Sequence, residues 1–267
     1  KATELNDRYK NNNMVLVAFG PHAPYTVSDK PLQHISTLAN ELEIPIHIHI
    51  HENTQEVVDA VAQHGKRPLE RLNDLGLLSH LLQCVHATQL EDTEIELMAS
   101  AGVTVVHCPA SNAGLASGMC RTQDILDAGI NLCIGTDGAA SNNELNMFNE
   151  MRLAALFGKT CTNNASATST WDVLTMATVN GARAMGMEDA LGTLAVGKLA
   201  DCVAVDLDHL NSQPVYDPVS TLVYSAQASQ VNYVWVDGRL SVANGEVLTV
   251  DSEAIKSRAA EWASKIH

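Results

Sequence analysis

Basic residues are scarce in this chain of 267 residues, which has 16 lysines and arginines against 31 aspartates and glutamates and a formal net charge of −15. This charge repels polyphosphate and anionic lipid, so it argues against nucleic acid and membrane surfaces as partners. The sequence also lacks a run of about 18 apolar residues and a recognisable N-terminal export signal. We therefore expect a cytoplasmic protein that binds a small molecule.

Several motifs of metal, redox and nucleophile chemistry are absent as well. None of the six cysteines belongs to a CxxC pair, and several lie in apolar runs, where a reduced, buried thiol is typical. The stretch HENTQ has Gln55 where a HExxH zinc site has its second histidine, and no PCxxC follows as in cytidine-type deaminases. There is no GxSxG, P-loop or GxGxxG. These absences exclude the sites that such motifs build.

From Met14 to Asp137, short β-branched runs alternate with longer helical patterns, which predicts parallel βαβ units. The five expected strands are MVLVAFG, IPIHIHIH, LLQCVHA, VTVVHC and NLCIGTD. Each is apolar on both faces apart from particular polar residues, as in a buried parallel sheet. An α/β barrel and an open doubly wound sheet both fit, and polar residues at the strand ends favour the barrel.

The composition changes after Asp137. Two helices are predicted in NNELNMFNEMRLAALFG and TWDVLTMATVNGARAMG, and residues 192–250 read as a series of short strands that includes TLVYSAQ. Asp237-Gly238 is a hairpin signal within this series. A last helix is expected from about Ser252. The predicted domains are residues 1–191 for the barrel, 192–250 for a small β module and 251–267 for the final helix.

The run IPIHIHIHENTQ places His47, His49 and His51 at alternate positions. Residues two apart in a strand share a face, so these histidines are expected to point together while the isoleucines between them pack under helices. A single buried histidine is usually a satisfied core residue. Three on one face, followed by Glu52, are costly to bury without a ligand, which indicates a metal or catalytic role for at least one.

Other polar residues end the neighbouring strands: His22 after the first, His86 at the third, His107 at the fourth and Asp137 at the fifth. The carboxyl ends of parallel strands meet at one edge, where barrel enzymes place their chemistry. Taken alone, His86 could be a core residue and Asp137 a loop cap. Imidazole and carboxylate are ligands that zinc prefers, so their placement at successive strand ends makes them candidates for a hydrolytic metal site.

Long motifs along the chain resemble those of a known family. The chain carries GPHAPYTVSD, PIHIHIHENTQEV, VHATQL, VVHCPASN, GTDGAASNNELNMFNEMR and YDPVSTLVYSA. These segments are similar to the amidohydrolase superfamily, and within it to the 5-methylthioadenosine/S-adenosylhomocysteine deaminases. The resemblance covers almost the whole chain from about Met14. It implies a TIM-like (β/α)8 barrel of the metal-dependent hydrolases, with part of a small β-sandwich in the C-terminal region.

The resemblance implies catalytic roles for four residues. His49 and Asp137 match ligands of one divalent metal ion, usually Zn²⁺. Glu52 matches the glutamate that shuttles a proton to the purine ring, and Asp137 also accepts a proton from the attacking water. His86 matches the histidine that orients this water and stabilises developing charge. The implied reaction is the hydrolytic deamination of a 6-aminopurine nucleoside, with ammonia and an inosine-type nucleoside as products.

The resemblance also implies substrate contacts. His22 and Ser141 match positions on the purine side of the substrate, where Glu52 and His86 lie as well. His47 and His51 match no catalytic position. Alternatives are a related enzyme that acts on another ring, of the guanine deaminase or triazine chlorohydrolase type, and an inactive binding or scaffold homologue. The preferred nucleoside, the native metal and a homo-oligomeric state stay open.

The strand that carries the family's HxH pair is missing from this sequence. The superfamily has an HxH pair of metal ligands on its first strand, whereas Glu52 and the order of the later motifs identify His47 to His49 as part of the fifth. Strands four to eight are therefore predicted here, and the first three are expected before Lys1 in the same polypeptide. The loop SNAGLASG also departs from the SNLKLASG of many relatives. We expect the 267 residues alone to bind metal weakly and to be inactive.

Overall fold

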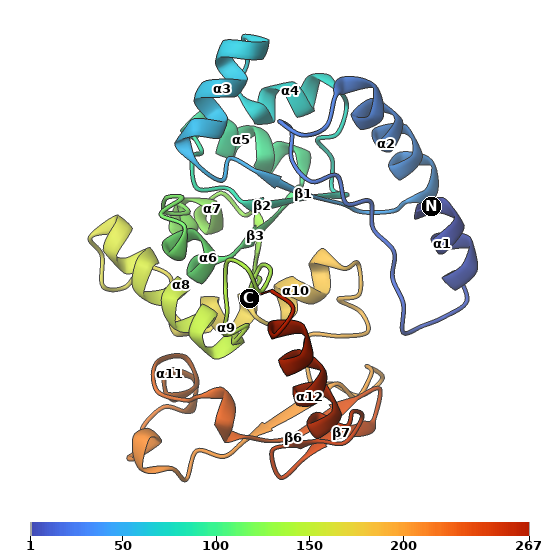
Figure 1. Ribbon diagram of the computed structural model, residues 1–267. Coiled ribbons are helices and arrows are strands. Elements are labelled where there is room, and N and C mark those ends of the chain that lie inside the picture. The colour runs from blue at the N-terminus through green and yellow to red at the C-terminus, as the bar shows by residue number, and fades with distance from the viewer. Residues whose placement is uncertain (1, 267) are drawn as a thin grey trace. The chain divides into compact units, whose positions relative to one another are not determined.

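The computed structural model describes residues 2–266. The chain divides into two compact units, Lys1–Glu188 and Asp189–His267, and the strands and helices of each are shown in Figure 1. None of the helices in the described residues is long and apolar enough to cross a membrane.

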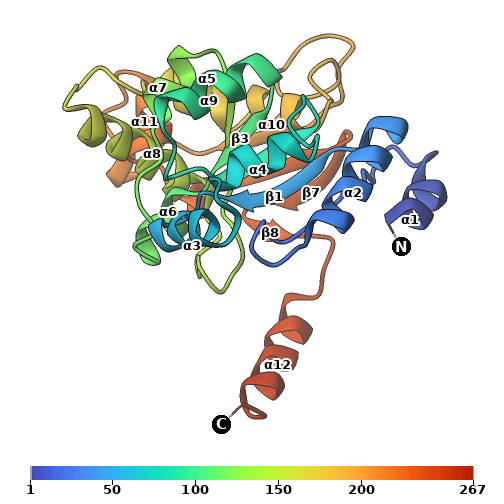
Figure 2. The same cartoon turned by 90° about the horizontal axis from the view of Figure 1, so that it is seen from above.

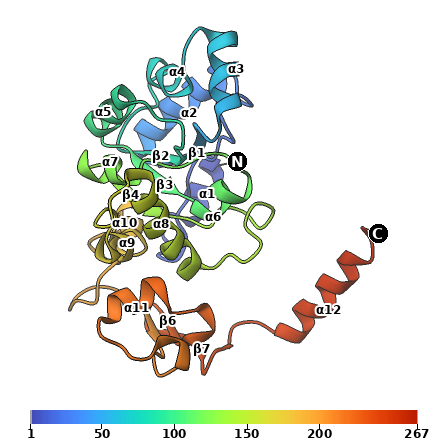
Figure 3. The ribbon, with the colours of Figure 1, turned by 90° about the vertical axis from the view of Figure 1, so that its left-hand side faces the viewer.

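A four-stranded parallel sheet is the centre of the first unit. Its strands follow the order of the chain: β1 Ile46–Ile50, β2 Leu82–His86, β3 Thr104–His107 and β4 Asn131–Ile134. The helices of this unit are α1 Ala2–Tyr9, α2 Asp29–Leu42, α3 Thr54–His64, α4 Pro68–Asp74, α5 Asp92–Ala101, α6 Pro109–Gly114, α7 Thr122–Asp127, α8 Met147–Thr162, α9 Thr170–Met176 and α10 Val179–Ala184. Helices α2 to α5 lie together on one side of the sheet in Figures 1 and 3.

The alternation predicted for β1 is confirmed. Ile46, Ile48 and Ile50 are at most 1% exposed, whereas His47 is exposed and His49 half-buried on the opposite face. The apolar face packs into the core that the helices cover, and burial of side chains of this size is worth about 2 kcal/mol each. The register pairs His49 with Val85 of β2, so the carboxyl ends of the strands lie at one edge of the sheet.

The first expected strand, MVLVAFG, was predicted wrongly. Within it only Phe19 pairs with the sheet, through an isolated parallel bridge to Ile46 in which Phe19 bonds to the carbonyl of Pro45 and receives the amide of His47. Phe19 is 6% exposed, but Met14 and Leu16 are 61% and 58% exposed. The segment borders the sheet at β1 and buries only one large side chain, so nothing in its packing holds the rest extended.

An antiparallel sheet forms the second unit, with strands in the order β5 Cys202–Val205, β6 Val231–Val236, β7 Arg239–Ala243 and β8 Glu246–Val247. The predicted hairpin is confirmed, because Asp237 and Gly238 join β6 to β7 with φ of 49° and 72°, the positive values of a type I′ turn. The short 3-10 helices η1 Leu210–Ser212 and η2 Ala228–Gln230 precede β6. Helix α12, Ser252–Ala263, begins where expected, has no buried residue and extends away from its sheet in Figure 2.

The expected strand TLVYSAQ is instead part of a helix, α11 Pro218–Tyr224. The side chain of Asp217 accepts a hydrogen bond from the amide of Ser220 at 2.9 Å, and Pro218 occupies the first helical position. Both are helix-start signals, and the first is the stronger because it satisfies an amide that the first turn leaves unpaired. The capping pair therefore outweighs the β-branched composition of the residues that follow.

Candidate active site

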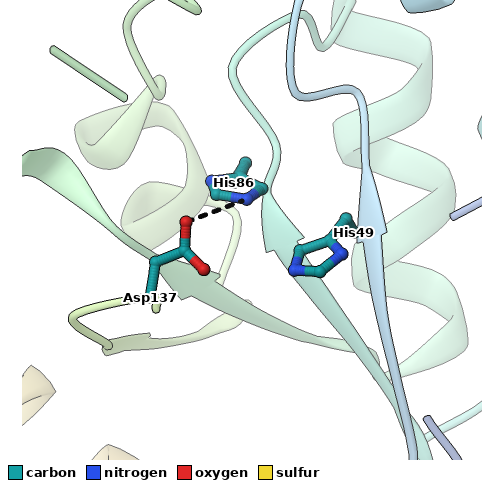
Figure 4. A group of neighbouring side chains, drawn as sticks. All are labelled: His49, His86 and Asp137. Atoms are coloured by element: carbon teal, nitrogen blue, oxygen red, sulfur yellow. Dashed lines mark ion pairs between the residues drawn. The ribbon is translucent and has the colours of Figure 1, made fainter. Parts of the chain in front are cut away.

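Three polar side chains meet at the carboxyl ends of the parallel strands. They are His49 in β1, His86 at the end of β2 and Asp137 just after β4, and one ligand-type atom of each lies within 4.8 Å of the others. Figure 4 shows the two imidazoles and the carboxylate gathered at this edge. We refer to these three residues as the ligand cluster.

The orientation of His49 is fixed by the carbonyl of His22. That oxygen accepts a hydrogen bond from Nδ1 of His49 at 2.8 Å and another from its backbone amide at 3.1 Å. A carbonyl can only accept, so Nδ1 carries the proton and the lone pair on Nε2 is available. An imidazole tied in this way is the usual arrangement of a metal-binding histidine. The ring also stacks on that of His86, with centroids 5.3 Å apart.

His86 is held by a side-chain amide. Oδ1 of Asn112 lies 2.8 Å from its Nδ1, and because this oxygen accepts, the proton of His86 sits on Nδ1. Nε2 then faces Asp137, whose Oδ2 is 4.0 Å away. The ring is 1% exposed. His86 and the following Ala87 have φ of 75° and 49°, a left-handed conformation that is costly for residues with a Cβ and that tends to occur at functional sites.

Hydrogen bonds prepare Asp137 as an anion. Oδ2 accepts from the hydroxyls of Ser111 at 2.7 Å and Ser141 at 2.6 Å, and Oδ1 accepts from the amide of Gly138 at 2.7 Å. Burial by itself raises the pKa of Asp137, but the bonds from Ser141, Ser111 and Gly138 and the nearby His86 outweigh it and hold the pKa below its ordinary value. The carboxylate is therefore ionised at neutral pH.

Glu52 follows His49 by three residues in the sequence, and hydrogen bonds to its backbone hold it in place. Its amide donates to Oε2 of the buried Glu56 at 2.7 Å, and its carbonyl accepts from the hydroxyl of Thr88 at 2.7 Å. Its carboxylate receives a long bond of 3.5 Å from the hydroxyl of Ser117. Burial raises the pKa of Tyr25, and the negative charges of Glu52 and Glu56 raise it further. The carboxylate thus borders the loop that holds Tyr25.

The two remaining predicted contacts are placed differently. His22 is exposed, with its ring edge against that of His49 at a centroid distance of 5.1 Å and Nδ1 3.1 Å from the hydroxyl of Thr26. The hydroxyl of Ser141 donates a hydrogen bond to Oδ2 of Asp137. The geometry therefore gives His22 an accessible ring beside the ligand cluster, and gives Ser141 a contact with a candidate ligand that the sequence did not suggest.

The prediction that His47, His49 and His51 share one face is wrong for His51. His51 follows the strand with φ of 53°, and this left-handed turn moves its ring into the interior, where it is fully buried. The amide of Leu69 donates to its Nε2 at 3.1 Å. His47 stays on the open face with Nδ1 2.7 Å from Oε1 of Gln83. His51 is thus a structural residue outside the ligand cluster.

Sequence reasoning missed several residues that orient the ligand cluster. Ser111 and Asn112 belong to the quoted motif VVHCPASN, yet only the coordinates show that one bonds to Asp137 and the other to His86. His107 was noted without a role. It is 2% exposed, neither of its ring nitrogens has a hydrogen-bond partner within residues 2–266, and burial, followed by the charge of His86, lowers its pKa to about 3. The signal that could have found Ser111 and Asn112 was their position just after the expected strand VTVVHC.

Comparisons with known proteins identify relatives of this chain. Over 266 residues the chain is 47% identical to a protein of Teredinibacter turnerae named 5-methylthioadenosine/S-adenosylhomocysteine deaminase, covering 100% of this chain and 60% of that one. It is 46% identical to a protein of the same name from Saccharophagus degradans, with the same coverage. The chain thus spans about 60% of the length of the curated relatives it matches.

Solved structures with the same fold as this chain include two zinc-bound hydrolytic enzymes. An adenosine deaminase from Xanthomonas campestris with bound zinc superposes with a TM-score of 0.98 at 46% identity, covering 99% of this chain and 60% of that one. Atrazine chlorohydrolase TrzN from Arthrobacter aurescens, complexed with zinc, superposes with a TM-score of 0.90 at 28% identity, covering 97% and 58%. Residues 2–241 match the model of the amidohydrolase family. This chain therefore belongs to the amidohydrolase family.

Proposed function

We propose that the protein to which this chain belongs is a zinc-dependent deaminase of 6-aminopurine nucleosides such as 5-methylthioadenosine, S-adenosylhomocysteine or adenosine. The observation that carries the proposal is the ligand cluster, in which two oriented imidazoles and an ionised carboxylate converge at the carboxyl edge of a parallel sheet. Deaminase relatives of 46–47% identity support the reaction, and a zinc-bound neighbour supports the metal.

The residues present fit a zinc ion. His49 offers Nε2 because its Nδ1 is bonded to a carbonyl, and Asp137 offers an ionised oxygen because three donors stabilise its negative charge. Imidazole nitrogen and carboxylate oxygen are both preferred by Zn²⁺. When bound there, the ion supplies positive charge that lowers the pKa of a water molecule towards about 7. We propose His49 and Asp137 as its ligands from this chain.

The other site residues handle protons and substrate. Asp137 accepts a proton from the attacking water, and Glu52 delivers one to the purine nitrogen beside the amino-bearing carbon, which removes aromatic resistance to attack. His86 presents Nε2 towards Asp137 and orients the water, and its ring is held by Asn112. The exposed ring of His22 lies beside His49, where it contacts the purine. In this scheme Ser141 acts chiefly by holding Asp137.

Within the described residues, the parallel sheet that carries the ligand cluster has two edge strands. Strands β1 and β4 are the edges of the four-stranded sheet, and β4 pairs only with β3 among the described residues. Since this chain spans about 60% of its relatives, we propose that the same polypeptide supplies the strands that close an eight-stranded barrel, together with further metal ligands. Residues 1–191 would belong to the barrel, residues 192–250 would contribute their antiparallel strands to a small β-sandwich, and the terminal helix follows them in the sequence.

A substrate panel tests the proposal. The complete zinc-loaded protein is incubated with 5-methylthioadenosine, S-adenosylhomocysteine, adenosine, guanine and a chlorotriazine, and release of ammonia or chloride is followed. We expect ammonia from the 6-aminopurine nucleosides and its loss after chelation of the metal. Chloride release from the triazine alone would replace the proposal with the chemistry named for TrzN, the similarity to which makes it the second candidate. A protein that binds no metal and turns over none of these would be a binding homologue.

A further inference from the structure

Glu150 of α8 carries a carboxylate that is completely buried, with an exposed fraction of 0%. Its Oε1 accepts a hydrogen bond from the side-chain amide of Asn142 at 2.7 Å, and its Oε2 accepts one from the backbone amide of Ala110 at 3.0 Å. Asn142 follows β4 in the loop that begins at Asp137, whereas Ala110 lies in the first turn of α6. One carboxylate therefore joins two segments that are far apart in the sequence.

Both segments hold the ligand cluster. Ser111 and Asn112, the two residues after Ala110, bond to Asp137 and to His86 respectively. On the other side, the amide of Asn142 also donates to the carbonyl of Thr136, the residue before Asp137, at 2.8 Å. Each hydrogen-bond partner of Glu150 is thus next in sequence to a residue that bonds to the ligand cluster. The spacing between His86 and Asp137 depends on how these two segments are held together.

The donors of this contact cannot be exchanged for acceptors. Oδ1 of Asn142 accepts from the amide of Leu145 at 3.3 Å, so its nitrogen must point to Thr136 and Glu150, and the other partner of Glu150 is a backbone N–H. Burial raises the pKa of Glu150 above its ordinary value, and the bonds from Ala110 and Asn142 offset only part of that rise. A buried carboxylate is unfavourable compared with an apolar side chain of similar size, so packing alone does not explain its presence.

We infer that Glu150 is a positioning residue for the zinc site, which fixes the distance between His86 and Asp137 by joining the start of α6 to the loop after β4. It touches neither substrate nor metal and acts through Ser111, Asn112 and Asn142. The inference rests on the proposed function, because it concerns the same metal site. It adds a residue on a distant helix that neither a strand-end pattern nor a ligand motif identifies.

The variant Glu150→Gln tests this role with almost no change in volume. Glutamine has one acceptor oxygen and one amide nitrogen, and that nitrogen must face either Asn142 or the N–H of Ala110, both of which are donors. One contact is lost and the two segments can move apart. We expect the affinity for Zn²⁺, measured by competition with a chromogenic chelator, to fall about tenfold or more, the effect typical of groups that orient metal ligands.

Glu96→Gln is the matched control, because Glu96 is an exposed carboxylate of α5 and the substitution makes the same chemical change. It should bind Zn²⁺ like the wild type. The visible absorption spectrum of the Co²⁺-substituted protein supplies a second readout, since a change in ligand geometry alters it whereas a purely structural role leaves it unchanged. We expect an altered spectrum for Glu150→Gln and an unaltered one for Glu96→Gln.

Three results would overturn the inference or its basis. Zinc affinity of Glu150→Gln within twofold of wild type, with an unchanged Co²⁺ spectrum, would refute the role of Glu150 while leaving the proposed function intact. A wild-type protein that binds no zinc would refute the proposed function and this inference with it. If Glu150→Gln does not fold, Asn142→Ala is measured in its place, and wild-type zinc affinity in that variant would refute the role equally.

Discussion

The run from His47 to His51 supplies imidazoles to two regions that differ in how fully their polar atoms are paired. In the ligand cluster, His49 and His86 each use Nδ1 for one hydrogen bond, which leaves the lone pair on Nε2 available, and Nε2 of His86 lies 4.0 Å from Oδ2 of Asp137. The second region is the buried ion network of His51, Arg67 and Glu94. There Arg67 makes a two-pronged contact with Glu94 at 2.9 and 2.8 Å, and its Nη2 also bonds to the carbonyl of Gln89.

The difference distinguishes the histidines that we propose as functional from one that is structural. His51 receives the amide of Leu69, and although Glu94 lies 3.2 Å from its Nε2, burial dominates and lowers the pKa of His51 to about 4. Its ring is therefore neutral and fully used inside the protein. In the ligand cluster, by contrast, nitrogen lone pairs and an anionic oxygen face a common point. Spare coordinating atoms at one edge of the sheet are what a metal site requires.

The largest effect is expected in the ligand cluster. His49→Ala removes the only side chain that β1 contributes to it, so the protein should lose its zinc and turnover should fall by at least about 10³-fold. Elemental analysis and ammonia release measure both. His47→Ala is the control on the same strand and face, and it should retain zinc. Full metal content in His49→Ala would remove this residue from the set of ligands.

A comparable loss of turnover, without loss of metal, is expected for Glu52→Gln. The amide cannot deliver a proton to the purine nitrogen, and positioned proton transfer contributes about 10²- to 10⁴-fold to rate. Zinc content should equal that of wild type, because Glu52 is not part of the ligand cluster. Gln55→Glu, which changes an exposed residue of α3, is the control and should leave turnover at the wild-type level. Wild-type turnover in Glu52→Gln would exclude it from the proton path.

The buried ion network predicts a pH effect on stability rather than on catalysis. An unfolded His51 binds a proton below about pH 6.5, whereas the folded ring does so only near its pKa of about 4. Stability is therefore lost as the pH falls through this window, by about 2 kcal/mol between about pH 7 and about pH 5. Urea unfolding of the metal-free protein at both pH values measures it.

Two variants separate His51 from the other histidines. His51→Gln should show a smaller loss of stability on acidification than wild type, although it is less stable at neutral pH. His64→Gln, which changes an exposed histidine at the end of α3, should keep the wild-type pH dependence. An unchanged pH dependence in His51→Gln would mean that the ring is charged, or solvated, in the folded protein.

The smallest effect is expected where polar groups are paired in solvent. Lys256 and Glu253 of α12 form an ion pair of 2.8 Å, with side chains that are 72% and 83% exposed. Water screens such pairs and side-chain entropy opposes them, so Lys256→Ala should leave the unfolding transition unchanged within error. Calorimetry of the variant checks this. A clear shift would show that a pair at the surface behaves like the buried ion network.

Much of the parallel sheet follows from the sequence, because period-two burial of the isoleucines in β1 and the common edge of parallel strands are local rules. They predict His49, His86 and Asp137 at neighbouring strand ends. They do not predict the left-handed turn at His51, because the turn depends on buried groups, such as the amide of Leu69, that contact its ring only in the folded chain. The prediction of a strand at TLVYSAQ was wrong because the helix cap at Asp217 outweighs the β-branched composition of this segment.

The contacts that orient the ligand cluster were beyond the reach of local rules. Glu150 lies in a helix whose pattern indicates only an amphipathic segment, and its partners are 8 and 40 residues away. A buried carboxylate with two fixed donors is recognisable only once the chain has folded. Pairing between distant segments, rather than any local propensity, determines which acidic residue of a helix is buried.

Anomalous diffraction at the zinc absorption edge, from crystals of the complete protein, tests the central claim most directly. The account predicts one strong peak at about 2.0–2.2 Å from Nε2 of His49 and from a carboxylate oxygen of Asp137, the usual zinc–ligand distances. A zinc peak elsewhere, or none at these two residues in fully loaded crystals, would contradict it.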